Sequence, residues 1–162
     1  MPIAGMNVDT GQKTWLTPPK IIEALGTFDL DPCCPPTMPW RTAAQMVHWP
    51  NDGLKANWTG KRVWLNPPYG RESIPFLKKM AEHKNGIALL FGRTDTFSWH
   101  EHVFPHCYSV MFMRGRIRFL TESGIEAGSA NAPSCLVAFS IEDHDKLSNS
   151  GISGFIMKRS ST

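Results

Sequence analysis

The 162-residue sequence lacks several features that would assign it to a special class. It has no run of about 18 apolar residues, the length that a membrane-spanning helix requires. Its first residues, MPIAGMNVDTGQK, lack the basic and apolar regions of a secretion signal. Its four cysteines form no C-x-x-C pair, so neither a zinc ribbon nor a disulfide framework is indicated. We therefore expect a soluble, cytoplasmic protein without a membrane partner or a bound metal.

The length favours one domain, residues 1–162, with a substantial buried core. We expect this core to span about residues 14–140, flexible ends on either side of it, and a monomer. The net charge of +3 and the isoelectric point of about 8.7 permit an anionic partner without requiring one.

Short apolar runs alternate with segments of helical spacing along the chain. The apolar runs predict strands at residues 27–31, 62–66, 86–91, 107–113 and 135–140. The helical spacing predicts helices at residues 18–25, 73–84 and 98–104, with Thr17 and Ser73 as N-caps. Residues 121–133 read as a long polar loop. This alternation predicts an α/β domain of three layers, in which helices cover both faces of a sheet.

The stretch VWLNPPYG, residues 63–70, joins an apolar strand to a rigid turn. The strand must stop at Asn66, because neither Pro67 nor Pro68 can donate a ladder hydrogen bond. The Asn66 side-chain oxygen and the Pro67 carbonyl are hydrogen-bond acceptors beside the Tyr69 ring. An exocyclic amine lying flat on this ring could donate both protons to them, which would free its lone pair for attack. We expect this turn and residues 31–34, DPCC, to follow the carboxyl ends of two strands, where open α/β sheets bind ligands.

The NPPY turn is similar to the [DNS]-P-P-[YFW] motif of S-adenosylmethionine-dependent amino-group methyltransferases. With it, four further strings, in order, resemble the compact phage and prophage DNA N6-adenine methyltransferases: TWLTPPKIIEAL (14–25), FDLDPCC (28–34), NDGLKANW (51–58) and RGRIRF (114–119). The resemblance implies a compact Rossmann-like fold, S-adenosylmethionine as cofactor, and double-stranded DNA as partner in a bacterial host cell. The substrate would be an adenine flipped out of the duplex.

The resemblance also implies roles for individual residues. The catalytic turn would be Asn66, Pro67, Pro68 and Tyr69, with Tyr69 stacking on the flipped base. The cofactor would lie against Trp15, Thr17, Pro18, Asp31, Pro32, Asp52 and Asn66. Asp52 is the only acid between Asp31 and Asn66, so it is the candidate for a contact to the cofactor's ribose or adenine, although it could equally form a turn. The sequence has no glycine between Asp31 and Gly53, whereas many cofactor folds have a glycine-rich turn after the first strand.

Basic side chains supply a candidate DNA surface. Alternating arginines in MRGRIRF would share one face if the segment is extended, and Arg71 follows the NPPY turn; the candidate DNA-binding residues are Arg71, Arg114, Arg116 and Arg118. Charge alone is equally compatible with an ordinary solvated edge strand. The polar loop 121–133 could enter a groove of the duplex.

Three other functions fit the same residues. A protein glutamine-N5 methyltransferase uses a similar pocket, although such enzymes usually carry a glycine-rich first motif. A cytosine-N4 methyltransferase shares the chemistry, although its turn more often begins with serine. A non-catalytic DNA-binding relative would keep the fold alone, but the intact Asn66 and Tyr69 argue against it.

Overall fold

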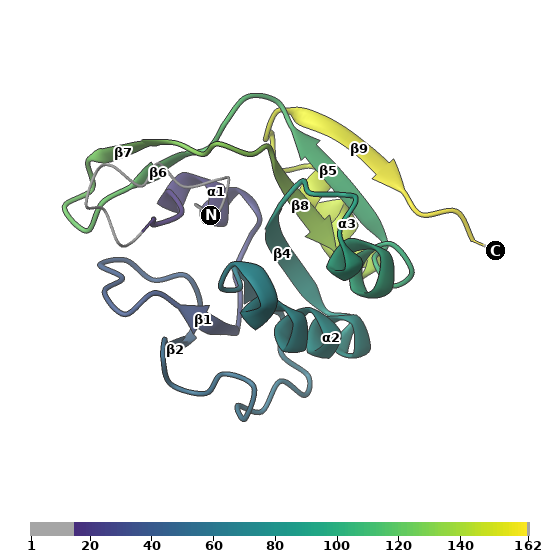
Figure 1. Ribbon diagram of the computed structural model, residues 1–162, viewed down its shortest axis with the longest axis horizontal. Helices are drawn as coiled ribbons and strands as arrows, with labels where there is room; N and C mark the ends of the chain where they lie inside the picture. Colours follow the sequence, from purple (N-terminus) through teal and green to yellow (C-terminus); the bar gives the residue numbers. More distant parts are fainter. Residues whose placement is uncertain (1–14, 162) are drawn as a thin grey trace.

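Seven strands form one mixed sheet, in the order β2-β1-β3-β4-β8-β5-β9, in a computed structural model that describes residues 15–161 (Figure 1). Strands β2, β1, β3 and β4 run parallel, whereas β8 is antiparallel to both of its neighbours and β9 is antiparallel to β5. The seven strands are β1 (Leu30–Cys34), β2 (Gln45–His48), β3 (Val63–Leu65), β4 (Gly86–Phe91), β5 (Ser109–Met113), β8 (Ser134–Ala138) and β9 (Gly154–Lys158).

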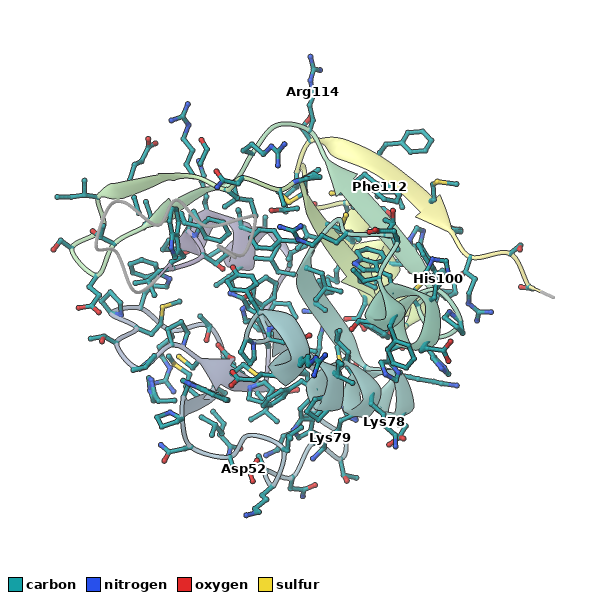
Figure 2. All side chains as sticks on the ribbon, in the orientation of Figure 1. Asp52, Lys78, Lys79, His100, Phe112 and Arg114 are labelled. Carbon is teal, nitrogen blue, oxygen red and sulfur yellow. The ribbon has the colours of Figure 1, made fainter. Side chains whose placement is uncertain are left out.

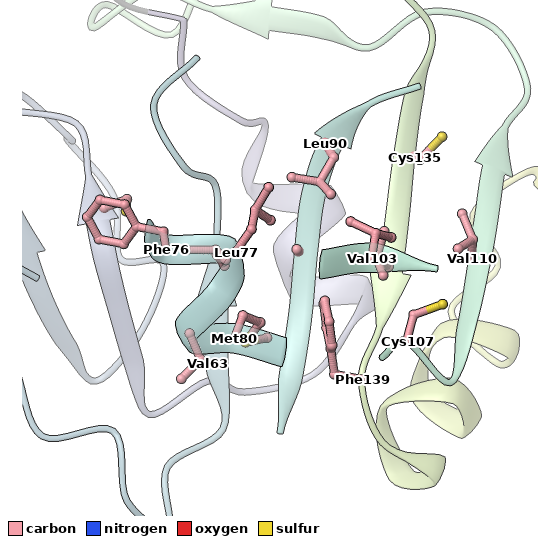
Figure 3. Packing of buried hydrophobic residues seen from close by; sticks show 14 of the residues in the cluster. Val63, Phe76, Leu77, Met80, Leu90, Val103, Cys107, Val110, Cys135 and Phe139 are labelled. Atoms are coloured by element: carbon pink, nitrogen blue, oxygen red, sulfur yellow. The ribbon is translucent and has the colours of Figure 1, made fainter. Parts of the chain in front are cut away.

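Helical segments cover both faces of this sheet. They are α1 (Pro19–Ala24), the 3₁₀ turn η1 (Gly70–Glu72), α2 (Ser73–His83), the π-helical turn η2 (Trp99–Val103) and α3 (Ile141–Ser148). Alternate residues of β4 point to opposite faces. Ile87 packs with α1 and α3, whereas Leu90 packs with α2 and η2, as Figure 3 shows for Leu77, Met80 and Val103. The predicted mixed α/β class with helices on both faces is confirmed.

The predicted elements are largely present, but three predictions about where elements begin and end are wrong. Thr17 does not cap α1, because Pro18 precedes the helix and the Thr17 hydroxyl contacts Asn66 instead. The first strand begins at Leu30 and does not break at Pro32, so DPCC lies within β1 rather than beyond it. Pro32 is tolerated in this strand because the pairing with β2 shifts register there. Ser73 lies inside the helical run begun by η1, and its hydroxyl donates to the Gly70 carbonyl.

The segment 121–133, expected to be a polar loop, instead contains half of a hairpin. Strand β6 (Arg118–Leu120) pairs with β7 (Glu126–Ser129) in a separate two-stranded sheet. Gly128, at φ +120°, supplies a conformation that this second strand needs. Beyond the expected core, α3 and β9 continue the fold as far as Lys158. The expectation of a flexible N-terminal end concerns residues outside those that the structure describes.

Candidate active site

The NPPY turn lies where β3 ends, beside the last residue of β4. Asn66 is half-buried, and its Nδ2 donates to Thr17 Oγ1 over 3.4 Å. This bond orients the amide so that Oδ1 is left as an acceptor for another donor. The Thr17 segment therefore contacts the catalytic turn, although the two are 49 residues apart in sequence.

Tyr69 forms part of the wall of a cavity of about 440 Å³. The cavity lies between the NPPY turn, the first half of α2, the end of β4 and the segment from Arg93 to Trp99. The Tyr69 ring is 38% exposed and stacks on Phe91, with ring centroids 4.8 Å apart and planes 9° from parallel. Loss of hydration raises the pKa of Tyr69 to about 12, so its hydroxyl stays protonated at neutral pH. The cavity wall thus contains the Tyr69 ring and the two prolines that follow Asn66.

Asp31 is a buried carboxyl group within β1. It is 1% exposed, and its two oxygens accept hydrogen bonds from Thr42 Oγ1 at 2.5 Å and from the Cys33 amide at 3.0 Å. Burial raises the pKa of Asp31 to about 6, against the lowering effects of these two hydrogen bonds and of His48. Asp31 is therefore mostly ionised at neutral pH, yet no ion pair to it occurs within residues 15–161. A buried negative charge of this kind favours a positively charged ligand nearby.

A segment that sequence reasoning missed joins Asp31 to the catalytic turn. Trp40 Nε1 donates to the Thr17 carbonyl at 3.2 Å, and two residues later Thr42 donates to Asp31. Hydrogen bonds therefore connect Asn66, Thr17, the segment 40–42 and Asp31. Nothing in the local sequence around residues 40–42 indicates this role, because Thr17 and Asp31, which this segment contacts, are distant in sequence.

Asp52 forms a turn, which is the second of its two predicted roles. Its Oδ1 accepts from the Leu54 amide at 3.0 Å, and its Oδ2 pairs with Lys55 at 3.3 Å on the surface. The next residue, Gly53, lies against β1. A Cβ on Gly53 would lie only 1.8 Å from the Pro32 carbonyl oxygen, so only a glycine allows this segment to approach β1 so closely.

Trp15 packs against the β6–β7 hairpin. Its ring meets Phe119 edge-on, with centroids 5.9 Å apart. Next to it, Leu16 and Leu120 exchange two backbone hydrogen bonds of 3.0 and 2.9 Å. Pro18 is buried next to Thr17. The hairpin is therefore tied to the segment that contacts Asn66.

The candidate DNA-binding arginines are exposed but do not lie on one strand. Arg118 lies in β6 and forms an ion pair with Glu126 at 3.3 Å. Arg116 comes just before β6, and the exposed Arg116 and Arg118 alternate with the buried Ile117. Arg114 lies in a bend after β5 and points away from the molecule, on the side opposite Asp52 (Figure 2). The expectation of a single arginine face therefore holds only for Arg116 and Arg118. Arg71 lies apart from them, in the cavity wall.

Metal and thiol chemistry find little support in the described part of the chain. Within residues 15–161, no three histidine, cysteine or acidic side chains are grouped to hold a metal ion. All four cysteines are free and buried, and burial raises the pKa of Cys34 to about 12 and that of Cys135 to about 11. Such thiols are poor nucleophiles at neutral pH. No helix among the same residues is long and apolar enough to cross a membrane.

Comparison with known proteins agrees with the motif resemblance. The model of one family, DNA N-6-adenine-methyltransferase (Dam), matches residues 6–154. A DNA N-6-adenine-methyltransferase of Haemophilus phage HP1 is 28% identical over 119 residues, which cover 69% of this chain and 66% of that protein. One of Escherichia phage T1 is 32% identical over 99 residues, which cover 56% of this chain and 40% of that protein.

The chain thus spans slightly less than two thirds of the first of these relatives and less than half of the second. No solved structure matches it. The family match, however, includes β1, the NPPY turn, the cavity wall and the hairpin. This chain therefore belongs to the DNA N-6-adenine-methyltransferase (Dam) family.

Proposed function

We propose that this protein transfers a methyl group from S-adenosylmethionine to the exocyclic N6 amine of an adenine flipped out of double-stranded DNA. The family match and the names of both relatives support the reaction. The observation that carries the proposal is the Asn66–Tyr69 turn, which has an oriented amide at Asn66 and, three residues later, a stacked aromatic ring in the wall of a cavity. We further propose a Rossmann-like single domain that acts as a monomer in the cytoplasm of the bacterial host.

The residues around β1 fit a cationic cofactor. S-adenosylmethionine carries a sulfonium and an ammonium group, and when bound it supplies an electrophilic methyl group. Asp31 provides the buried negative charge that such a cation would offset. Because both oxygens of Asp31 are already engaged, we assign it an electrostatic role; direct contacts would come from Asn66, Trp15 and the chain around Pro18 and Pro32.

Asn66 and Tyr69 would orient and polarise the amine. Asn66 Oδ1 and the Pro67 carbonyl would each accept one of its protons, drawing the nitrogen toward tetrahedral geometry and exposing its lone pair. Pro67 and Pro68 limit the backbone freedom of these acceptors. Tyr69 would stack on the base and hold its amine in the plane of the two acceptors, Asn66 Oδ1 and the Pro67 carbonyl. The nitrogen loses its extra proton after transfer, so catalysis consists of orientation and electrostatic stabilisation.

The hairpin and the cavity rim would bind the DNA. Arg116, just before the hairpin, and Arg118, in its first strand, are exposed, and Arg71 lies in the cavity wall that also contains Tyr69. Phosphate contacts from these residues and from Arg114 would position the duplex without reading its sequence. Because Leu16 and Leu120 are hydrogen-bonded, a duplex on the hairpin would lie next to the Thr17–Asn66 contact.

The test is to incubate the protein with methyl-labelled S-adenosylmethionine and unmethylated duplex DNA, and to identify labelled nucleosides by mass spectrometry. We expect N6-methyl-2′-deoxyadenosine. Label on cytosine would mean that the substrate base is cytosine rather than adenine. Label on a protein added to the reaction would favour the glutamine-N5 alternative. A protein that binds cofactor and DNA but labels nothing would be the non-catalytic relative.

Substitution of Asn66 by alanine tests the catalytic assignment. We expect a loss of at least about 100-fold in kcat, because a preorganised polar group is removed, with a much smaller loss of cofactor affinity in calorimetry, because the other proposed cofactor contacts remain. Asn149→Ala is the matched control, because Asn149 lies at the end of α3 and bonds only within that helix through Nδ2. Near wild-type turnover in Asn66→Ala would contradict the assignment.

A further inference from the structure

Tyr69 is held by an aromatic partner that the sequence motif does not include. The rings of Tyr69 and Phe91 are nearly parallel, 9° apart, with centroids 4.8 Å from each other. The two residues come from different elements, the turn after β3 and the end of β4. Both line the cavity at which the catalytic turn lies.

Phe91 is the more firmly fixed of the two residues. It ends β4 in register with Ser134 of β8, and its carbonyl accepts a hydrogen bond of 3.0 Å from Trp99 Nε1. The next amide, that of Gly92, donates to the Pro133 carbonyl at 2.8 Å. Tyr69, by contrast, lies on an irregular turn and is 38% exposed. The backbone of Phe91 is therefore held by the neighbouring strand β8 and by Trp99, and the Tyr69 ring stacks on a residue at this fixed strand end.

We propose that Phe91 is a positioning residue for the methyl transfer, an inference that rests on the proposed function. It covers one face of the Tyr69 ring and fixes its plane, so that the target base stacks on the other face in one orientation. The stack would then run from Phe91 through Tyr69 to the adenine. Offset parallel stacking is a favoured arrangement for aromatic rings, and the ordering of Tyr69 is complete before the base arrives. Phe91 touches neither the methyl donor nor the amine.

The experiment compares three variants at single turnover on unmethylated duplex DNA. Phe91→Leu removes the ring while keeping an apolar side chain, and Phe91→Tyr restores an aromatic ring. Phe155→Leu is the matched control, because Phe155 is an exposed phenylalanine of β9 outside the cavity wall. Each variant is characterised by its rate of methyl transfer, its KM for DNA, its Kd for S-adenosylmethionine and its thermal unfolding.

We expect the transfer rate of Phe91→Leu to fall about tenfold, with the Kd for the cofactor unchanged, because the position of the base is disturbed. Phe91→Tyr should recover most of the rate, and Phe155→Leu should match the wild type. If Phe91→Leu does not fold, Phe91→Met replaces it as the non-aromatic variant.

Two results overturn the inference while leaving the proposed function intact. One is a wild-type rate, or a faster one, in the non-aromatic variant; a faster rate would mean that Phe91 holds Tyr69 away from the base. The other is an equal loss in the leucine and tyrosine variants, which would indicate a packing role. A wild-type protein that forms no N6-methyl-2′-deoxyadenosine overturns both proposals together.

Discussion

Substitution of Asp31 by asparagine is expected to stabilise the folded protein above neutral pH while weakening cofactor binding. Burial raises the pKa of Asp31 from 3.8 to about 6. Below pH 3.8 the Asp31 carboxyl is protonated in both the folded and the unfolded chain, so its burial does not lower the free energy of unfolding through charge. Between the two values only the unfolded chain releases this proton, so the folded chain binds more protons and the free energy of unfolding falls as pH rises. Above about pH 6 burial of the ionised Asp31 carboxylate lowers the free energy of unfolding by a constant amount, about 3 kcal/mol.

Asparagine keeps the shape of the side chain and removes the charge. Its Oδ1 can accept from the Cys33 amide, and its Nδ2 faces the Thr42 hydroxyl. At about pH 8 we therefore expect Asp31→Asn to recover much of the 3 kcal/mol, and at about pH 4 to recover little. Urea unfolding at both pH values measures this difference. The exposed Asp29 provides the control variant, Asp29→Asn, which carries no cost of charge burial.

The same variant tests the electrostatic role in cofactor binding. Calorimetry should show at least about tenfold weaker binding of S-adenosylmethionine to Asp31→Asn, because one full charge opposite a cation is lost. Wild-type affinity should also fall as pH drops below about 6, where Asp31 gains its proton. A variant less stable than wild type by equal amounts at both pH values would refute the reasoning on burial. A stabilised variant with unchanged affinity would refute the role in binding.

Two further predictions concern the packing of Gly53 beside β1 and the binding of DNA by the hairpin. Gly53→Ala should lower the free energy of unfolding by more than about 2 kcal/mol, because a Cβ there would lie 1.8 Å from a backbone oxygen; Gly124→Ala, with open space at φ +76°, should cost only about 1 kcal/mol. Urea unfolding of both variants measures the difference, and equal costs would contradict the close approach. Joint replacement of Arg116 and Arg118 by alanine should reduce the slope of log DNA affinity against log salt concentration by about 1.8. Fluorescence anisotropy gives this slope, and Lys78→Ala on α2 should leave it unchanged; an unaltered slope in the double variant would contradict phosphate contacts from the hairpin.

The sequence predicts those parts of the fold and site that local patterns determine. The apolar run at residues 86–91 matches β4 residue for residue, because a strand covered on both faces needs apolar side chains throughout. The stop at Asn66 follows from the two prolines after it. The contact of Asn66 with Thr17 agrees with roles that only the family resemblance supplied.

Features that depend on distant partners were beyond sequence reasoning. The surroundings of Asp31 require Thr42, which reaches it only when the chain folds back after β1. The glycine beside β1 comes from position 53, not from a turn directly after the strand. Segment 121–133 reads as a loop because β7 is half-exposed and contains a glycine, and its pairing with β6 gives it the form of a strand. Phe91 appears in the sequence only as the end of an apolar run.

The position of β8 has a consequence for how the protein assembles during synthesis. This strand lies between β4 and β5, yet it follows both of them along the chain. Until residues 134–138 leave the ribosome, β4 and β5 each have an open edge facing the place of the missing strand, where another chain could pair. A message that stopped before Ser134 would therefore remove the middle strand of the sheet together with the edge strand β9, and would leave β4 open on one side and β5 open on both.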